Sequence, residues 1–138
     1  MRFCLPNSSR TFEIADEWLI EAGFQGFHPN STVYVSQRSP KQTVIAGDLP
    51  VEAILACQVA PPERDTGVRW FDRDRMVHIL RGFVDGAPIP PVEVQELRDQ
   101  HRYKYGVRDG VHRFYASAAA GFDYLPVLIF PYFDIREG

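Results

Sequence analysis

The apolar residues of this chain change their spacing at proline and glycine positions, and this alternation limits the fold more than any other feature of the sequence. Between residues 49 and 130, segments in which every second residue is apolar, as in strands, are interleaved with segments of helical spacing. Prolines and glycines mark most of the boundaries between them. Short strands interleaved with short helices predict an α+β fold, a single domain with a small mixed sheet flanked by helices.

The spacing also predicts where the elements lie. We expect strands over 51–59, 92–97, 102–108 and 126–130 and helices over 12–24, 73–83 and 112–120. The second and third of these strands are expected to form a hairpin. Residues 25–48 predict loops with one or two short strands, around the apolar runs at 33–35 and 44–45. Alternation within the first strand places Cys57 among the inward-facing residues, so we expect it to be a small buried hydrophobe.

Composition excludes several classes of protein. The 138 residues are 45% apolar, which fits one domain with one core. There are 15 Lys and Arg against 18 Asp and Glu, so no chain-wide positive field favours nucleic acid. The longest apolar stretch, 124–133, has ten residues and two prolines, too few for a membrane span. Because the first residues lack an apolar signal segment, we expect a cytoplasmic protein without a membrane partner.

The spacing of the Cys, His and carboxylate residues does not favour a metal site or a disulfide. Cys4 and Cys57 form no Cys-x-x-Cys motif and no Cys/His pair at metal spacing. The carboxylates of Glu52, Glu93 and Asp109 do not follow the spacing of a nuclease metal centre. We therefore expect free thiols and no metal-ligating residues.

The most informative segment runs from Arg108 to Arg113, where a predicted strand turns into a predicted helix. Unpaired backbone N–H groups and the positive end of the helix dipole meet there, which favours a phosphate or carboxylate. Arg113 suits bidentate contact with an oxyanion, and His112 suits hydrogen-bond donation or proton transfer. Asp109 suits the capping position of the helix. The same spacing also fits a turn that Gly110 merely permits, with both side chains making structural contacts.

Several ordered segments resemble the superfamily of ParB N-terminal domains and sulfiredoxins. They are the proline-rich lead-in Pro90–Val94, the strand Tyr103–Val107, the Gly-x-His-Arg turn and helix of Asp109–Ala116, the pair Ala120-Gly121, and Leu125–Val127. The resemblance covers roughly residues 49–130. It implies a ParB/sulfiredoxin-like domain at 49–138, with residues 1–48 as an N-terminal extension packed on that domain.

The resemblance implies that this turn and the helix at 71–80 bind the phosphates of a nucleotide. The residues that match the family's turn are Gly110, Val111, His112 and Arg113. Arg75 falls where a cationic phosphate ligand sits in sulfiredoxin-like members, and His78 falls near a hydroxyl ligand. The implied cofactor is a nucleoside triphosphate with Mg²⁺. The implied partner is a nucleotide or another phosphorylated small molecule.

Two departures from the family limit what the resemblance implies. Sulfiredoxins carry a nucleophilic Cys at the position of Val111, and a valine cannot attack phosphate or sulfinate. Neither Cys4 nor Cys57 lies in the motif. Eight residues follow Phe130, too few for the helix-turn-helix region with which ParB proteins read DNA. We therefore expect neither sulfiredoxin activity nor ParB-type centromere binding.

A basic stretch and an aromatic pair offer further candidates. Residues 98–113 hold five Arg or Lys against two Asp, a local net charge of +3, with Tyr103 and Tyr105 between them. Such a stretch suits single-stranded nucleic acid. Strand alternation would instead put the tyrosines and the cations on opposite faces. This favours a solvent-exposed basic face with the tyrosine rings buried on the other side of the strand. The pair Trp70-Phe71 likewise favours a core anchor over a base-stacking platform.

Three classes of function stay open on the sequence. The first is a nucleotide-binding, ParB-like protein that is associated with DNA. The second is a phosphoryl-transfer or nucleotide-hydrolysing enzyme, in which His112 and Arg113 stabilise charge and a carboxylate such as Glu52 acts as base. The third is an interaction module that keeps the fold without the ligand.

Overall fold

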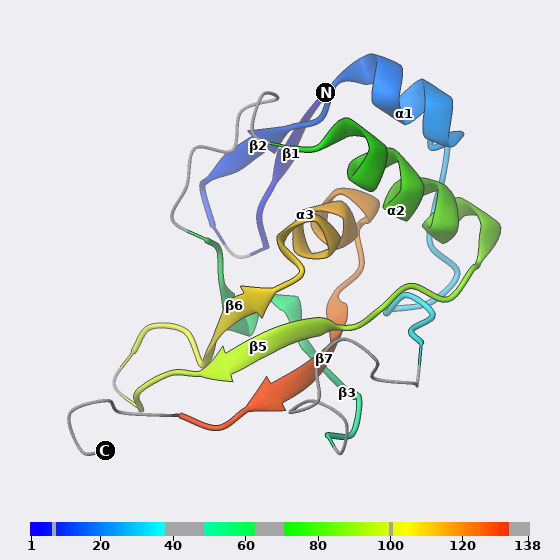
Figure 1. The fold of residues 1–138 in the computed structure, drawn as a ribbon. Helices are drawn as coiled ribbons and strands as arrows, with labels where there is room; N and C mark the ends of the chain where they lie inside the picture. The colour runs from blue at the N-terminus through cyan, green and yellow to red at the C-terminus, as the bar shows by residue number, and fades with distance from the viewer. Residues whose placement is uncertain (7, 38–48, 63–70, 100, 133–138) are drawn as a thin grey trace.

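The computed structural model describes residues 1–6, 8–37, 49–62, 71–99 and 101–132. Within them the chain forms three α-helices, a five-stranded mixed sheet and a separate two-stranded sheet (Figure 1). The expected α+β class, a single domain with a small mixed sheet flanked by helices, is confirmed. No described helix combines the length and the apolar character that crossing a bilayer would require.

The larger sheet consists of β3 (Glu52–Leu55), β4 (Val59–Ala60), β5 (Val92–Glu96), β6 (Tyr105–Asp109) and β7 (Tyr124–Phe130). Its spatial order is β3-β7-β5-β6-β4. The predicted hairpin is confirmed as the antiparallel pair of β5 and β6, while β7 runs parallel to β5. Since β5 and β6 are antiparallel, the end of β6 lies beside the start of β5. The turn that follows β6 therefore opens next to the proline-rich segment that precedes β5.

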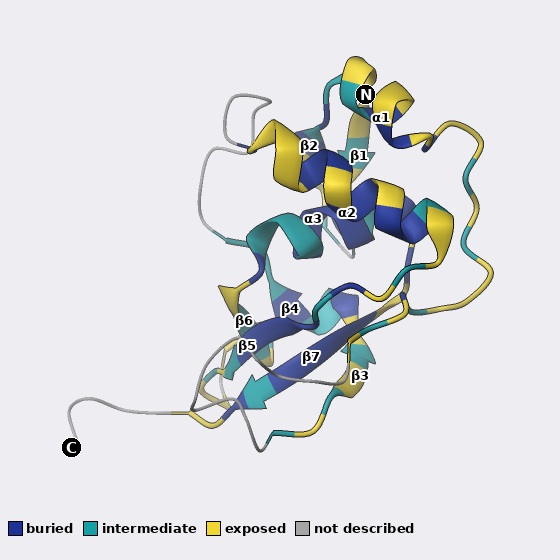
Figure 2. Ribbon diagram, turned by 45° about the vertical axis from the view of Figure 1, so that its right-hand side comes forward, coloured by how far each residue is buried: buried dark blue, intermediate teal, exposed yellow. Residues whose placement is uncertain are grey.

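The helices α1 (Asp16–Ala22), α2 (Arg73–Asp85) and α3 (Val111–Ala120) lie together on one side of this sheet (Figure 1). α2 contacts both α1 and α3, and α3 also contacts the small sheet of β1 (Arg2–Cys4) and β2 (Thr11–Glu13). Strands β5 and β7 are largely buried beneath the helices (Figure 2). The buried residues of the N-terminal elements share the main core with those of α2, α3 and the large sheet, and Leu128 and Phe130 form a second, small cluster with Leu49 and Val51.

The predicted helix at 73–83 is confirmed and extends two residues further, to Asp85. It begins after Asp72, whose carboxylate accepts a hydrogen bond from the Arg75 N–H at 3.0 Å, the expected N-cap. Its apolar stripe packs into the core through Met76, Ile79, Leu80 and Phe83. The predicted helix at 112–120 is confirmed as α3, which begins one residue earlier.

The predicted helix at 12–24 is wrong at its start. Residues 11–13 form β2, which pairs with β1 and buries Phe12 against Phe71 and Tyr115. The pairing with a distant strand overrides the local helical spacing there. The end of the prediction is confirmed, because the helix stops at Gly23 in a left-handed conformation, with φ of 71°.

The single strand predicted over 51–59 is also wrong. The chain forms β3, a 3₁₀ turn over Ala56–Gln58 and then β4, and these two strands pair at opposite edges of the sheet. Because only the three residues of this 3₁₀ turn separate β3 from β4, the sheet must curl so that its two edges approach each other. The turn breaks the alternation, so that Leu55 is 38% exposed. Cys57 is therefore only half-buried, and the prediction of a buried Cys57 is wrong.

The strand predicted over 102–108 begins later, at Tyr105, and the preceding residues form a loop. In the region predicted as loops with short strands, Ser36 forms a parallel bridge with Ile89, and Tyr34 is buried. The run at 44–45 and Trp70 lie outside the described residues. Phe71 is buried, as expected for a core anchor.

Candidate functional site

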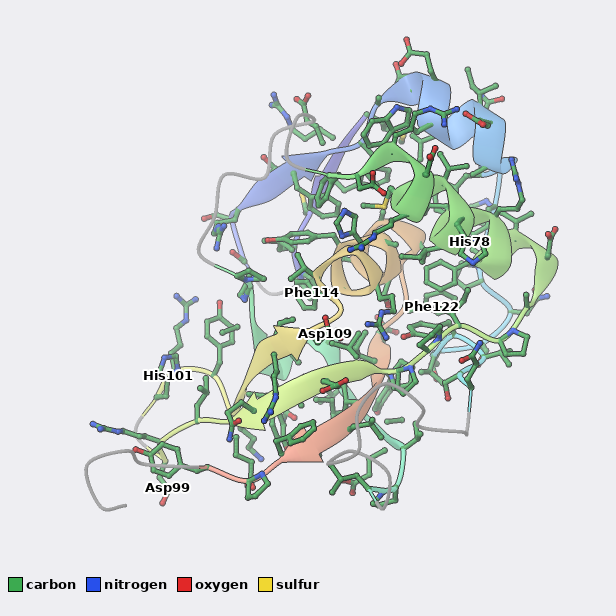
Figure 3. All side chains as sticks on the ribbon, viewed as in Figure 1. His78, Asp99, His101, Asp109, Phe114 and Phe122 are labelled. Carbon is green, nitrogen blue, oxygen red and sulfur yellow. The ribbon has the colours of Figure 1, made fainter. Side chains whose placement is uncertain are left out.

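A cleft of about 670 Å³ opens between the start of α3, the first turns of α2 and the proline-rich segment before β5. Two lining residues outside the predicted set help to locate it, namely Asp109 at the end of β6 and Ile89 before β5. Figure 3 labels His78 and Asp109, which come from two sides of the cleft. All of the predicted phosphate-binding residues line it, namely Arg75, His78, Gly110, Val111, His112 and Arg113. The structure thus brings together residues of α2 and of the start of α3 that are at least 32 positions apart in the sequence.

The start of α3 is an uncapped helix end. Gly110 occupies the N-cap position with φ of 102°, and no side chain in the described part of the chain caps the helix. The prediction that Asp109 caps this helix is therefore wrong. The first helical hydrogen bond runs from the Phe114 N–H to the Gly110 carbonyl oxygen at 2.9 Å. The N–H groups of residues 111–113 consequently have no acceptor within the helix, and they lie at the positive end of its dipole.

Arg113 is held by protein groups on the wall of the cleft. Its Nη1 donates to the Pro91 carbonyl oxygen at 2.5 Å, and its Nη2 lies 3.6 Å from an Asp109 carboxylate oxygen. The side chain is only 14% exposed. A guanidinium has five N–H donors, so these contacts leave some of them for a ligand. The first task of Arg113 is nevertheless to tie α3 to the start of β5.

Gly110 is required at the turn for two reasons. Its φ of 102° lies in the region that residues with a Cβ rarely adopt. A Cβ at this position would also stand 3.0 Å from Cζ of Arg113. The absence of a side chain therefore allows the guanidinium to lie directly against the backbone of the turn.

His112 joins the starts of the two helices. Its Nε2 accepts a hydrogen bond from the Asp72 N–H at 2.8 Å, and its ring packs edge-to-face on Phe71. Burial, reinforced by the positive charge of Arg75, lowers the pKa of His112, against the opposite effect of Asp72. Because Nε2 acts as an acceptor, this nitrogen does not donate to a phosphate, and the neutral ring is favoured.

Arg75 and His78 project from the exposed face of α2, one turn apart. The guanidinium of Arg75 makes no hydrogen bond or ion pair with any residue in the described part of the chain. It lines the same cleft as the start of α3, and its positive charge contributes to the lowered pKa of His112. Ile79, Ile89 and the prolines that flank Ile89 also line the cleft and give it apolar surface beside these charges. Of the two arginines that line the cleft, Arg113 is partly engaged by protein groups, whereas all the guanidinium donors of Arg75 are available as far as the described residues go.

Sequence reasoning missed the environment of Glu93. This residue alternates with the buried Val92 and Val94, which predicts an outward side chain. It is nevertheless 2% exposed, and its Oε2 has no hydrogen-bond partner among the residues that the structure describes. It lies opposite Asp109 in the β5–β6 register, at a bulge. Burial and the neighbouring charge of Asp109 raise the pKa of Glu93, while Arg108 and Arg113 oppose the shift. No pattern in the sequence marks this burial.

Of the three carboxylates considered in the sequence analysis, Asp109 lines the cleft, whereas Glu52 and Glu93 do not. Glu52 lies on β3 at the edge of the sheet and does not line the cleft, so it is not placed to act as the base. Within the described ranges, no group of three or more His, Cys, Asp or Glu is arranged to hold a metal ion.

No protein-family model matches the chain, and no curated protein gives a significant match to its sequence.

Proposed function

We propose that the protein binds a nucleotide, or another phosphorylated small molecule, in the cleft between α2 and α3. One observation carries the proposal: the start of α3, which no side chain in the described ranges caps, and the guanidinium of Arg75, which has no ion pair or hydrogen bond with a described residue, line the same cleft. A phosphate accepting from the N–H groups of residues 111–113 would satisfy the open helix end. Arg75 would add a charge-assisted hydrogen bond from the opposite side.

The other features of the cleft support a nucleotide rather than free phosphate. A volume of about 670 Å³ is in the range of small-molecule sites. The apolar wall of Ile79, Pro88 and Ile89 would cover a base or sugar, which inorganic phosphate lacks. Nucleoside triphosphates carry Mg²⁺ mainly on their own phosphates, and Asp109 is the one carboxylate among the described lining residues that could contact it.

We propose binding without sulfiredoxin chemistry. Val111 contributes no nucleophile to the cleft, and Cys4 and Cys57 line a different hollow. A ParB-like role, with DNA as a further partner, is compatible with such a nucleotide site. We also propose a cytoplasmic location, where the thiols of Cys4 and Cys57 would stay reduced.

Titration calorimetry with ATP, CTP, GTP and UTP, each with and without Mg²⁺, tests the proposal. We expect saturable binding of at least one nucleotide, weakened about tenfold or more by Arg75→Gln because one charge-assisted contact is lost. Arg81→Gln removes the same charge from the outer face of α2 and should leave the affinity unchanged. If no nucleotide binds at millimolar concentration, the proposal fails and an interaction module is the better account.

A further inference from the structure

A second hollow, separate from the nucleotide cleft, lies at the opposite end of the β5–β6 hairpin and has a volume of about 490 Å³. The turn between β1 and β2, the segment after β4 and the loop between β5 and β6 enclose it. Its described lining includes Arg10, His101, Arg102 and Tyr103 and contains no carboxylate. We call this hollow the hairpin groove. The absence of negative charge from its described walls favours an anionic occupant.

Internal hydrogen bonds hold the loops that form the hairpin groove. The turn between β1 and β2 is closed by a bond from the Leu5 N–H to the Arg10 carbonyl oxygen, and the Arg10 N–H donates to Ser8 Oγ at 3.1 Å. In the opposite loop, the Tyr103 N–H donates to His101 Nδ1 at 3.1 Å. This bond leaves the proton of the neutral ring on Nε2, as a donor. The basic groups are thus presented by structured loops (Figure 3 labels His101).

Cationic and aromatic groups share one surface in the hairpin groove. Cζ of Arg102 lies 5.4 Å from the ring centroid of Tyr103, and the ring of His101 lies 6.3 Å from the same centroid. The strand alternation that would separate tyrosines from arginines does not apply here, because β6 begins only at Tyr105. The sequence-based reason for preferring a merely solvated face is therefore absent at these residues.

Other cations of the hairpin are engaged elsewhere. Arg98 Nε donates to the Tyr132 hydroxyl at 2.8 Å, and Arg108 stacks on the Phe130 ring at 3.9 Å. By contrast, the guanidinium groups of Arg10 and Arg102 make no ion pair with a described carboxylate. Two arginines and a histidine donor therefore face the groove with their donors available.

We propose that the hairpin groove binds single-stranded nucleic acid. Arg10 and Arg102 would contact phosphates, and the rings of Tyr103 and His101 would stack against bases. An acidic peptide could pair with the two arginines, but its carboxylates would not stack on the rings of Tyr103 and His101. The proposal is independent of the nucleotide cleft, which lies at the other end of the hairpin.

Fluorescence anisotropy with a labelled deoxythymidine oligonucleotide of about 12 nucleotides tests the proposal. We expect binding that weakens about sevenfold between about 50 and 200 mM salt, as two neutralised phosphates on a single strand would give. The double variant Arg10→Gln/Arg102→Gln should lose about tenfold or more in affinity. The matched double variant Arg2→Gln/Arg81→Gln removes two exposed charges elsewhere and should bind like the wild type.

Further variants distinguish base stacking from charge attraction, and the hairpin groove from the nucleotide cleft. Tyr103→Leu should weaken oligonucleotide binding about fivefold and leave binding of inorganic polyphosphate unchanged, because polyphosphate has no bases. Arg75→Gln, in the nucleotide cleft, should leave oligonucleotide binding unchanged. The proposal is overturned if the oligonucleotide does not bind, or if both double variants weaken it equally. It is also overturned if duplex DNA or polyglutamate binds as tightly as the single strand.

Discussion

Arg113 links the start of α3 to the start of β5, and its neighbours explain why. The Pro90 and Pro91 carbonyl oxygens accept from the Tyr34 hydroxyl and from Arg113, respectively, so the lead-in to β5 is held from two sides. Proline offers no N–H, which makes its carbonyl the only backbone group by which these positions can be tied. A residue predicted as a phosphate ligand therefore also has a structural task.

Replacing Arg113 should consequently destabilise the protein. Arg113→Ala removes a hydrogen bond from a largely buried charged group and leaves the Pro91 carbonyl without its donor, which costs about 1.5–3 kcal/mol. Urea denaturation measures the difference in the free energy of unfolding. Arg75→Gln changes an exposed arginine of α2 whose guanidinium has no hydrogen bond or ion pair with a described residue, so it serves as the control and should change stability little. An unchanged urea midpoint for Arg113→Ala would show that these contacts do not support the fold.

His112 should make stability depend on pH. Its pKa is lowered in the folded state, so between that pKa and the ordinary value the unfolded chain binds a proton that the folded chain does not. The contribution of His112 is therefore present above about pH 6.5 and decreases as the pH falls below that value. In His112→Gln the side-chain oxygen replaces Nε2 as an acceptor for the Asp72 N–H but does not titrate.

Urea denaturation of both proteins at about pH 5.5 and about pH 7.5 tests this dependence. The free energy of unfolding of the wild type should drop between these values by more than that of His112→Gln. Equal drops in the two proteins would show that the bond from Asp72 does not couple the titration of His112 to folding.

At the level of elements, the sequence correctly predicted the helices whose ends are marked by residue types that favour helix ends. Helix α2 has Asp72 at its start and a continuous apolar stripe, and α3 lies between Gly110 and Gly121, so both were predicted within two residues. Such boundaries depend on neighbouring residues only, which is why a single sequence reveals them.

The failures lie where distant pairing decides the structure. Residues 11–13 have helical spacing but pair with β1, and the predicted strand at 51–59 divides because its halves belong to opposite edges of the sheet. The burial of Glu93 depends in the same way on the strands beside β5. Within the candidate site, the sequence identified six of the twelve described lining residues, but not that Arg113 and His112 are held by Pro91 and Asp72.

On the scale of the whole molecule, the β5–β6 hairpin separates two anion-binding candidates. The nucleotide cleft lies where β6 ends and α3 begins, and the hairpin groove lies around the loop at the other end. The chain carries a net charge of −3, so both depend on local arrangements of donors rather than on a general positive field.

The most direct test of the central claim is a titration of the ¹⁵N-labelled protein with a nucleotide, followed by the backbone amide resonances. Amides that donate to a phosphate shift because their hydrogen-bond acceptor changes. We predict that the largest shifts occur at Val111, His112 and Arg113, whose N–H groups precede the first helical hydrogen bond. Saturating nucleotide that leaves these three amides unchanged, or that shifts only residues of the hairpin groove, would contradict a phosphate site at the start of α3.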